Sequence, residues 1–253
     1  MTFDFNPAWL SAVLLCSLRL SALLLLTPLM QALGMPLRVR MVLILALSVT
    51  LVSGMGLRVA ASPLDLPSML LAGINELFVG ALMAYGIFAA FAAFSFAGNA
   101  LDLQIGFNIA NIYDPLTRSQ SPLLASLLGM LAVALFFGMD AHHALLRGFA
   151  YSLERVPLGR AMTLPDPTLL IKQFGTVFTL GLMLAAPVLF CLFLVELAMA
   201  VLSRNLQQMN IFILGAPVKI AVGLVLLASM SSHLGVVAEK IFNGVFLFWD
   251  AVL

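Results

Sequence analysis

Charged side chains are scarce in this sequence. Asp, Glu, Lys and Arg make up 9% of its 253 residues, whereas a soluble domain carries about 25%. Hydrophobic residues account for 63% of the chain, and the mean hydropathy is +1.13. A chain of this composition cannot cover its surface with groups that water solvates. We therefore expect an integral membrane protein.

Cysteine and basic residues are scarce as well. The two cysteines, Cys16 and Cys191, lie in apolar stretches without CxxC spacing, so we expect buried thiols rather than a redox pair or metal ligands. A net charge of +1 does not provide the basic surface that nucleic acid requires. No Lys or Arg precedes the first apolar stretch, and Asp4 lies there, so we predict that this stretch is not a cleaved signal peptide.

Motifs of catalysis are missing too. The sequence has no Gly-rich phosphate loop, nucleophile elbow, HExxH or Walker motif. We expect no enzyme, no catalytic residues and no cofactor.

What the sequence does contain is a series of long apolar segments. These segments are Trp9–Gln31, Met41–Leu57, Leu66–Leu101, Ser119–Met139, Gln173–Ser203 and Asn205–Ala238, with a shorter tail at Ile241–Trp249. Backbone groups in lipid must be satisfied within a segment, and no period-2 alternation indicates a barrel. The sequence therefore predicts an all-α membrane fold.

Two of these segments are too long for one simple span. Leu66–Leu101 would reach about 54 Å as one helix, against a hydrocarbon core of about 30 Å. Gln173–Ser203 is also long and contains Pro187. Either these helices are broken, or protein rather than lipid covers much of their apolar surface.

Small residues recur at four-residue spacing in the first of these long segments. They are Gly80 and Ala84, Gly86 and Ala90, and Ala89, Ala93 and Ala97. This spacing lets helix backbones approach closely. Packing inside the chain and packing against other subunits both explain it.

Four charged residues lie within apolar segments: Arg19, Glu76, Glu196 and Lys219. A charge at mid-membrane costs at least ~2.5 kcal/mol, so each should face protein, water or an opposite charge. Two interpretations are open. In the first, these residues form a proton or ion relay; in the second, they pair with one another or with neighbouring subunits as structural contacts. We favour pairing, because a relay usually places several carboxylates on one face.

The segment Asp140–Gly159 predicts an amphipathic helix near residues 141–155 that lies at the membrane interface, with Asp140 as its N-cap. Its apolar stripe consists of Leu145, Leu146, Phe149 and Leu153. His142 and His143 are adjacent and should point apart. With no third ligand at helical spacing, we expect no metal site.

A polar loop from about Leu101 to Pro122 separates two apolar segments and includes GFNIANIYDP. Four of its residues are apolar, namely Phe107, Ile109, Ile112 and Tyr113. Loops longer than ~12–15 residues are uncommon unless they are functional or disordered. Physical reasoning leaves two alternatives open, which are a plug in an aqueous path and a surface connector.

Two blocks of the sequence carry a family resemblance. The matching positions are Gln104, Gly106 and Ala110 in a Gln-x-Gly-x-x-x-Ala core, Asp114 and Pro115, His142 and His143, and the segment Asn205–Leu227 with its ILGAPVKI. On these residues the chain resembles the flagellar biosynthetic protein FliR family, which is similar to the T subunit of injectisome export gates. QQMN stands where many relatives have Pro-Gln-Leu-Asn, a departure that concerns the local turn and not the resemblance.

The resemblance implies a single export-gate membrane domain over 1–253, with N-terminal helices in 1–100, a plug loop in 101–122 and C-terminal helices in 123–253. Its long, partly broken helices and hairpins would pack into a hetero-oligomeric helical assembly in the bacterial inner membrane, at the flagellar basal body. The implied partners are the P and Q subunits, the B-type switch subunit, membrane lipid and exported unfolded proteins, with no nucleic acid. The implied plug residues are Gly106, Phe107, Asn108, Ile109, Ala110, Asn111, Ile112, Tyr113, Asp114 and Pro115.

Three other interpretations stay open. The chain is an injectisome T subunit, or a small ion-coupled secondary transporter with Glu196 or Glu76 as its coupling site, or a membrane scaffold without a pore. ILGAPVKI favours the flagellar version of the export gate.

Overall fold

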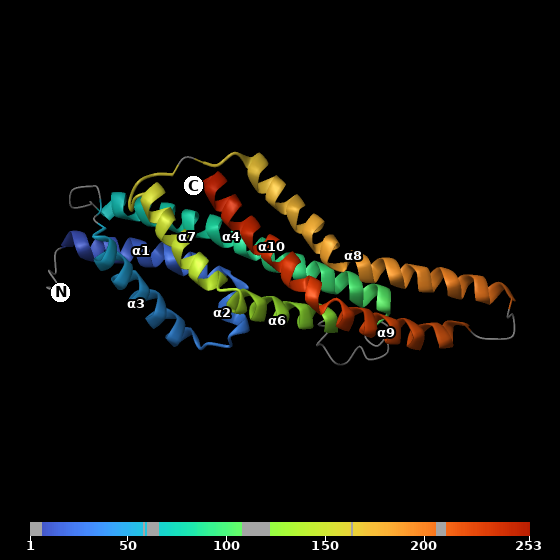
Figure 1. Cartoon of the computed structure of the whole chain (residues 1–253). Coiled ribbons are helices and arrows are strands. Elements are labelled where there is room, and N and C mark those ends of the chain that lie inside the picture. Colours follow the sequence, from blue (N-terminus) through green and yellow to red (C-terminus); the bar gives the residue numbers. More distant parts are fainter. Residues whose placement is uncertain (1–6, 58, 60–65, 108–121, 163, 206–210) are drawn as a thin grey trace. The chain divides into compact units, whose positions relative to one another are not determined.

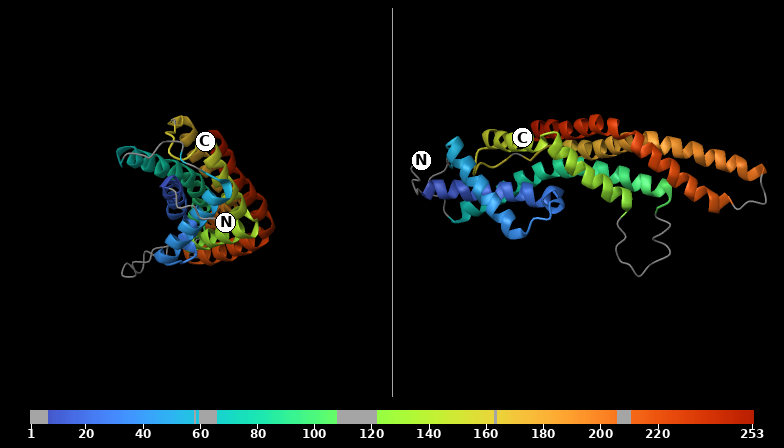
Figure 2. Two further views of the ribbon diagram at one scale, coloured as in Figure 1. Left: turned by 90° about the vertical axis from the view of Figure 1, so that its left-hand side faces the viewer. Right: turned by 60° about the horizontal axis from the view of Figure 1, so that its bottom comes forward.

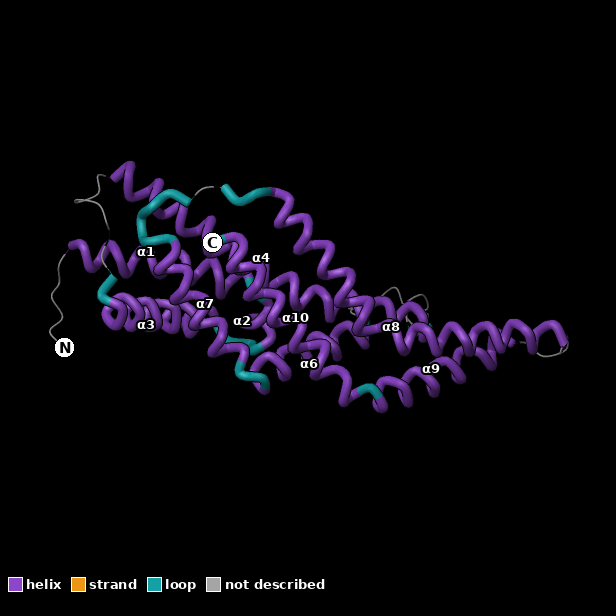
Figure 3. Tube along the Cα trace, turned by 45° about the horizontal axis from the view of Figure 1, so that its top comes forward, coloured by secondary structure: helices purple, strands orange, loops and turns teal. Residues whose placement is uncertain are grey.

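Every regular element in the described part of the protein is a helix. The structure is a computed structural model, and it describes residues 7–57, 59, 66–107, 122–162, 164–205 and 211–253. No strand occurs in these ranges, and Figure 3 accordingly shows helices in purple and loops in teal but no orange strand. The prediction of an all-α membrane fold is confirmed.

The helices are labelled in Figure 1. Their bounds are α1 Pro7–Leu26, α2 Pro28–Ala32, α3 Leu37–Met55, α4 Leu66–Ile105, α6 Leu123–Gly138, α7 Ala141–Arg155, α8 Pro167–Asn205, α9 Ile211–Ser229 and α10 Ser231–Val252. Within the described residues, four helices are long and apolar enough to cross a membrane. The number rises to six if each of two bent helix pairs counts as one span.

The chain divides into two compact units. Unit 1 comprises Met1–Ala89, Asp140–Gln173 and Gly244–Leu253, and unit 2 comprises Ala90–Met139 and Phe174–Asn243. Each unit is therefore assembled from segments that lie far apart in the sequence.

The two overlong segments are continuous helices. Helix α4 has 40 residues, and α8 has 39 residues and includes Pro187 without ending there. The alternative of a break is therefore wrong for both. Most of the apolar stretch of α4 is buried, in keeping with cover by protein, but only about a third of the corresponding stretch of α8 is buried.

Two other apolar segments do break. The first is interrupted at Thr27, just before Pro28 begins α2, since proline lacks an N–H and suits the first position of a helix. The segment Asn205–Ala238 is split at Met230, between α9 and α10, where no Gly or Pro marks a boundary. The tail Ile241–Trp249 is not a separate element, since it belongs to α10.

The small residues of α4 pack inside the chain. In unit 1, a Cβ at Gly80 would collide with the carbonyl of Arg19 in α1, and one at Gly86 would meet Trp249 of α10. In unit 2, Ala93 and Ala97 are fully buried. The other members of the set, Ala84, Ala89 and Ala90, are buried too. Internal packing therefore accounts for the spacing.

Unit 2 has an aromatic core. The ring of Phe242 lies 6.0 Å from those of Phe91 and Phe94 and 5.4 Å from that of Phe136, between centroids. In the same unit, the unit 2 part of α8 lies alongside α9 (Figure 2). This arrangement brings two apolar segments together as a hairpin.

Helix α7 covers the segment for which the sequence predicts an amphipathic helix. Leu145, Phe149 and Leu153 of its apolar stripe are buried, and Leu146 is 36% exposed. These three buried side chains contact protein rather than lipid headgroups. Asp140 precedes the helix but makes no side-chain capping bond, and it adopts a left-handed conformation with φ 55°.

Candidate functional site

Arg19 and Glu76 form a buried ion pair in unit 1. Arg19 Nε donates to Glu76 Oε2 at 2.6 Å, and both side chains are fully buried. The two remaining guanidinium nitrogens donate to the carbonyls of Ser152 and Val156, each at 2.9 Å. The backbone N–H of Gly159 donates to Glu76 Oε1 at 3.0 Å. The pair thus joins α1, α4 and the C-terminal end of α7.

This network satisfies the hydrogen-bonding groups that burial would otherwise leave without partners. A buried pair with good geometry offsets its desolvation only when such additional hydrogen bonds are present. Arg19 and Glu76 therefore act as a structural connection in unit 1.

Glu196 and Lys219 form a second pair, in unit 2. Lys219 Nζ donates to Glu196 Oε1 at 2.8 Å, and Gln104 Nε2 donates to Glu196 Oε2 at 3.2 Å. The side chain of Glu196 is 52% exposed and that of Lys219 is 21% exposed. The structure thus brings α4, α8 and α9 together at one polar contact.

The base of the polar loop is organised by Asp102, which is fully buried in unit 2. Its carbonyl accepts hydrogen bonds from the N–H groups of Gly106 and Phe107, each at 3.1 Å, where α4 ends. Its carboxylate accepts from Leu124 N at 3.0 and 3.1 Å and from Ala125 N at 3.1 Å, where α6 begins. One residue therefore contacts the chain on both sides of the loop.

These bonds have a simple physical basis. The first N–H groups of a helix have no intrahelical partner, and a carboxylate that accepts from them also interacts favourably with the helix dipole. Gly98 allows the close approach of α4 and α6, since a Cβ there would collide with the backbone of Ala125. Asp102 thus caps α6 from a different helix.

Only two of the predicted plug residues lie in the described part of the chain. Gly106 has a φ of 93°, a left-handed conformation that favours glycine, and Phe107 follows it half-buried. The residues Asn108, Ile109, Ala110, Asn111, Ile112, Tyr113, Asp114 and Pro115 lie outside the described residues.

Sequence reasoning missed Asp102, because it belongs to the polar run that was assigned to the loop as a whole. It also missed Asn75, whose side chain accepts from Met162 N at 3.2 Å and donates to the carbonyl of Arg160. A capping Asp usually lies next to the helix it caps, so a contact across 22 residues has no local signal.

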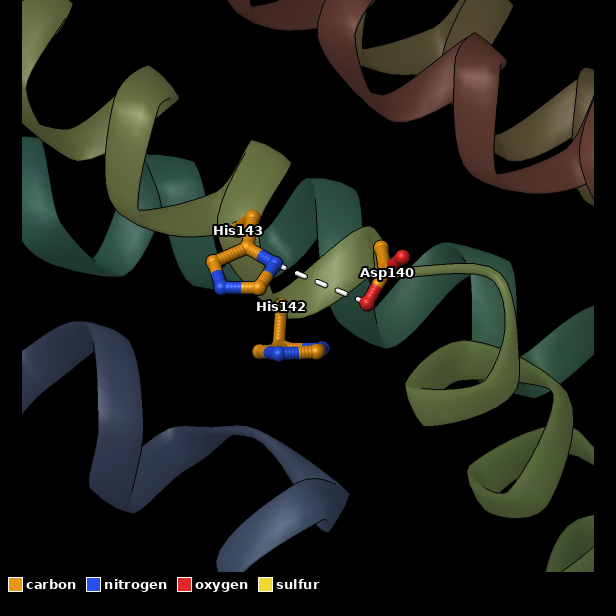
Figure 4. Close-up of side chains that lie close together, drawn as sticks. All are labelled: Asp140, His142 and His143. Atoms are coloured by element: carbon orange, nitrogen blue, oxygen red, sulfur yellow. Dashed lines mark ion pairs between the residues drawn. The ribbon is translucent and has the colours of Figure 1, made fainter.

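Three side chains converge at the start of α7, as Figure 4 shows. The ligand atoms of Asp140, His142 and His143 all lie within 4.8 Å of one another. The two imidazole rings are 4.1 Å apart between centroids. The expectation that the adjacent histidines point apart is therefore wrong, and so is the expectation that no third ligand lies at helical spacing, since Asp140 is three residues from His143.

The fold and its polar contacts define an all-α membrane protein whose helices hold paired charges inside apolar segments. The chain belongs to the family described as bacterial export proteins, family 1, which it matches over residues 10–245. This is the family of the flagellar biosynthetic protein FliR and of its injectisome T counterparts.

Individual relatives agree with this assignment. The chain is 35% identical to the flagellar biosynthetic protein FliR of Bacillus subtilis over 179 residues, which is 69% of each protein. It is 28% identical to the FliR protein of Escherichia coli over 240 residues, 94% of this chain and 91% of the relative. It is 30% identical to the Yop proteins translocation protein T of Yersinia pestis over 172 residues, 65% of this chain and 66% of the relative.

Proposed function

We propose that this chain is a non-enzymatic subunit of a flagellar type III export apparatus in the bacterial inner membrane, at the flagellar basal body. Its relatives from Bacillus subtilis and Escherichia coli carry flagellar names. The internal pairing of Arg19 with Glu76 and of Glu196 with Lys219 supports a structural rather than a catalytic use of the intramembrane charges.

Within that apparatus, residues 106–122 close the path through which unfolded proteins leave the cell. The observation that carries this proposal is Asp102, which contacts the chain on both sides of the segment. Asp102 fixes where the chain leaves α4 and where it enters α6, and apolar side chains in a narrow aqueous path exclude water. Phe107, Ile109, Ile112 and Tyr113 supply those side chains.

The partners of this subunit are the P and Q subunits of the export gate and the B-type switch subunit. Helix α8 would extend about 58 Å at about 1.5 Å per residue, and a bilayer core of about 30 Å covers only part of it. Its exposed large side chains include Ile171, Phe174, Phe178, Leu182, Phe190, Phe193, Leu197 and Val201. Those outside the lipid need protein cover, and neighbouring subunits provide it.

Deleting residues 107–118 tests the plug. Vesicles that contain the complete gate should become permeable to small ions and dyes, while the deleted chain still copurifies with its P and Q partners. The matched control replaces the polar residues Asn108 and Asn111 with Ser, which keeps the apolar side chains and should keep the vesicles tight. An assembled gate that stays tight after the deletion contradicts the plug.

Native mass spectrometry tests the assembly. The chain is expressed alone and then with its P and Q partners, and a single copy in a large hetero-oligomer is the expected result. A monomer or homodimer that ignores those partners would favour the transporter, with Glu196 as the first residue to replace.

The injectisome T subunit is a second candidate, because the Yersinia pestis relative carries that name. Complementation separates the two. We expect the chain to restore motility to a flagellated host that lacks this subunit, and not to restore secretion to a host that lacks the injectisome subunit.

A further inference from the structure

The start of α7 carries three side chains with the chemistry of metal ligands. Asp140 offers a carboxylate, and His142 and His143 offer imidazole nitrogens (Figure 4). Both histidines belong to the first turn of α7, and Asp140 immediately precedes it. All three donors thus come from one short stretch of unit 1.

The backbone explains why the donors converge. Asp140 has φ 55° and ψ 23°, and its carboxylate makes no capping bond to α7. The carboxylate instead lies beside His143, with 3.6 Å between Asp140 Oδ1 and His143 Nδ1. The turn itself is fixed, because Ala141 is buried and the N–H of His143 donates to the carbonyl of Asp140 at 3.0 Å.

These two donors form an ion pair that is too long for a direct hydrogen bond, and their distance is also close to the one that a shared ion requires. An N–H···O hydrogen bond measures about 2.7–3.2 Å. In a tetrahedral site with metal–ligand distances of about 2.0–2.1 Å, two ligand atoms lie about 3.4 Å apart. The 3.6 Å separation between Asp140 Oδ1 and His143 Nδ1 is close to that value.

Small side-chain rotations bring in the third donor. All pairs of ligand atoms lie within 4.8 Å, so each pair is about 1.4 Å or less from the tetrahedral separation. The side chains of His143 and Asp140 are 62% and 78% exposed, which leaves them free to adjust. Solvent reaches the cluster at these two exposed residues, so an ion can enter.

The donor set selects the class of ion. Two imidazoles and one carboxylate suit zinc, nickel, cobalt and copper, whereas magnesium and calcium prefer oxygen ligands alone. Three protein ligands leave a position for water or for a donor from a neighbouring subunit. We propose that Asp140, His142 and His143 bind a divalent transition-metal ion of the zinc class at the start of α7.

Metal titration of the full-length chain in detergent tests this site. The chain carries an affinity tag without histidine, and the probes are Zn²⁺ by calorimetry and Co²⁺ by its visible absorption, which reports on the ligands. We expect one ion per chain, Co²⁺ bands that Zn²⁺ displaces, and a melting temperature that rises with bound Zn²⁺ because the ion binds the folded state.

Single substitutions assign the ligands. His143→Ala and Asp140→Asn should each weaken Zn²⁺ binding by at least about tenfold, and His142→Ala with His143→Ala should abolish it. The matched control is His233→Ala, which removes the only other histidine of the sequence and should leave binding unchanged. Circular dichroism and gel filtration verify that each variant is folded.

Two results would overturn the proposal. One is Zn²⁺ binding that survives the double histidine substitution with unchanged affinity. The other is a folded wild-type chain that shows no saturable binding and no change in melting temperature. Both readouts are independent of export, so this proposal and the proposed function fail separately.

Discussion

Removing the carboxylate of Asp102 should open the start of α6. Asp102→Ala deprives Leu124 N and Ala125 N of their acceptor. A hydrogen bond to a charged group contributes about 1.5–3 kcal/mol net, and loss of a helix N-cap costs about 0.5–2 kcal/mol. Water can replace the lost acceptor more easily at the N–H of the half-buried Ala125 than at that of Leu124, because Leu124 is only 2% exposed. We therefore expect a local destabilisation of about 2–4 kcal/mol.

Hydrogen exchange measures this change directly. Because about 1.4 kcal/mol corresponds to a factor of ten, the amides of Leu124 and Ala125 should exchange about 30- to 1000-fold faster in the variant. Peptides from α1 should not change, since α1 belongs to unit 1. Asp102→Asn should give an intermediate effect, because its NH₂ group replaces one acceptor with a donor.

The matched control is Asn99→Ala, one turn earlier on α4. Among the described residues, its exposed side chain bonds to the carbonyl of Ser95 in the same helix and not to α6, so the exchange of Leu124 and Ala125 should stay as in the wild type. Unchanged exchange of these two amides in a folded Asp102→Ala protein would refute the capping role and with it the argument for a loop held at its base.

Three further predictions concern the helix contacts. Glu76→Gln should destabilise unit 1 by about 3–5 kcal/mol, because it leaves the buried Arg19 without its counter-charge; the melting temperature in detergent measures this, and an unchanged value contradicts the structural role. Gly80→Ala should cost about 1–3 kcal/mol or more by overpacking against the carbonyl of Arg19, whereas Gly129→Ala, with open space around it, should be neutral or stabilising. Glu196→Gln should reduce copurification with the P and Q partners more than it changes the dependence of export on the pH gradient, and normal assembly with loss of that dependence would instead support a relay.

The sequence alone was sufficient for the class of fold. With 9% charged residues the chain has too few polar groups to face water, and lipid admits only helices or closed barrels, so the helical membrane fold follows from composition and the absence of period-2 alternation. Such inferences hold because they depend only on neighbouring residues and on the solvent.

Only the tertiary structure decided which polar groups meet. Arg19 and Glu76 are 57 residues apart, and Asp102 reaches Leu124 across 22 residues. The sequence indicated that intramembrane charges need partners but not which partners, because pairing depends on how helices pack. The Asp140 cluster depends in the same way on one left-handed residue, whose φ of 55° turns an expected N-cap toward a histidine. Packing and backbone conformation, rather than residue type, determine these contacts.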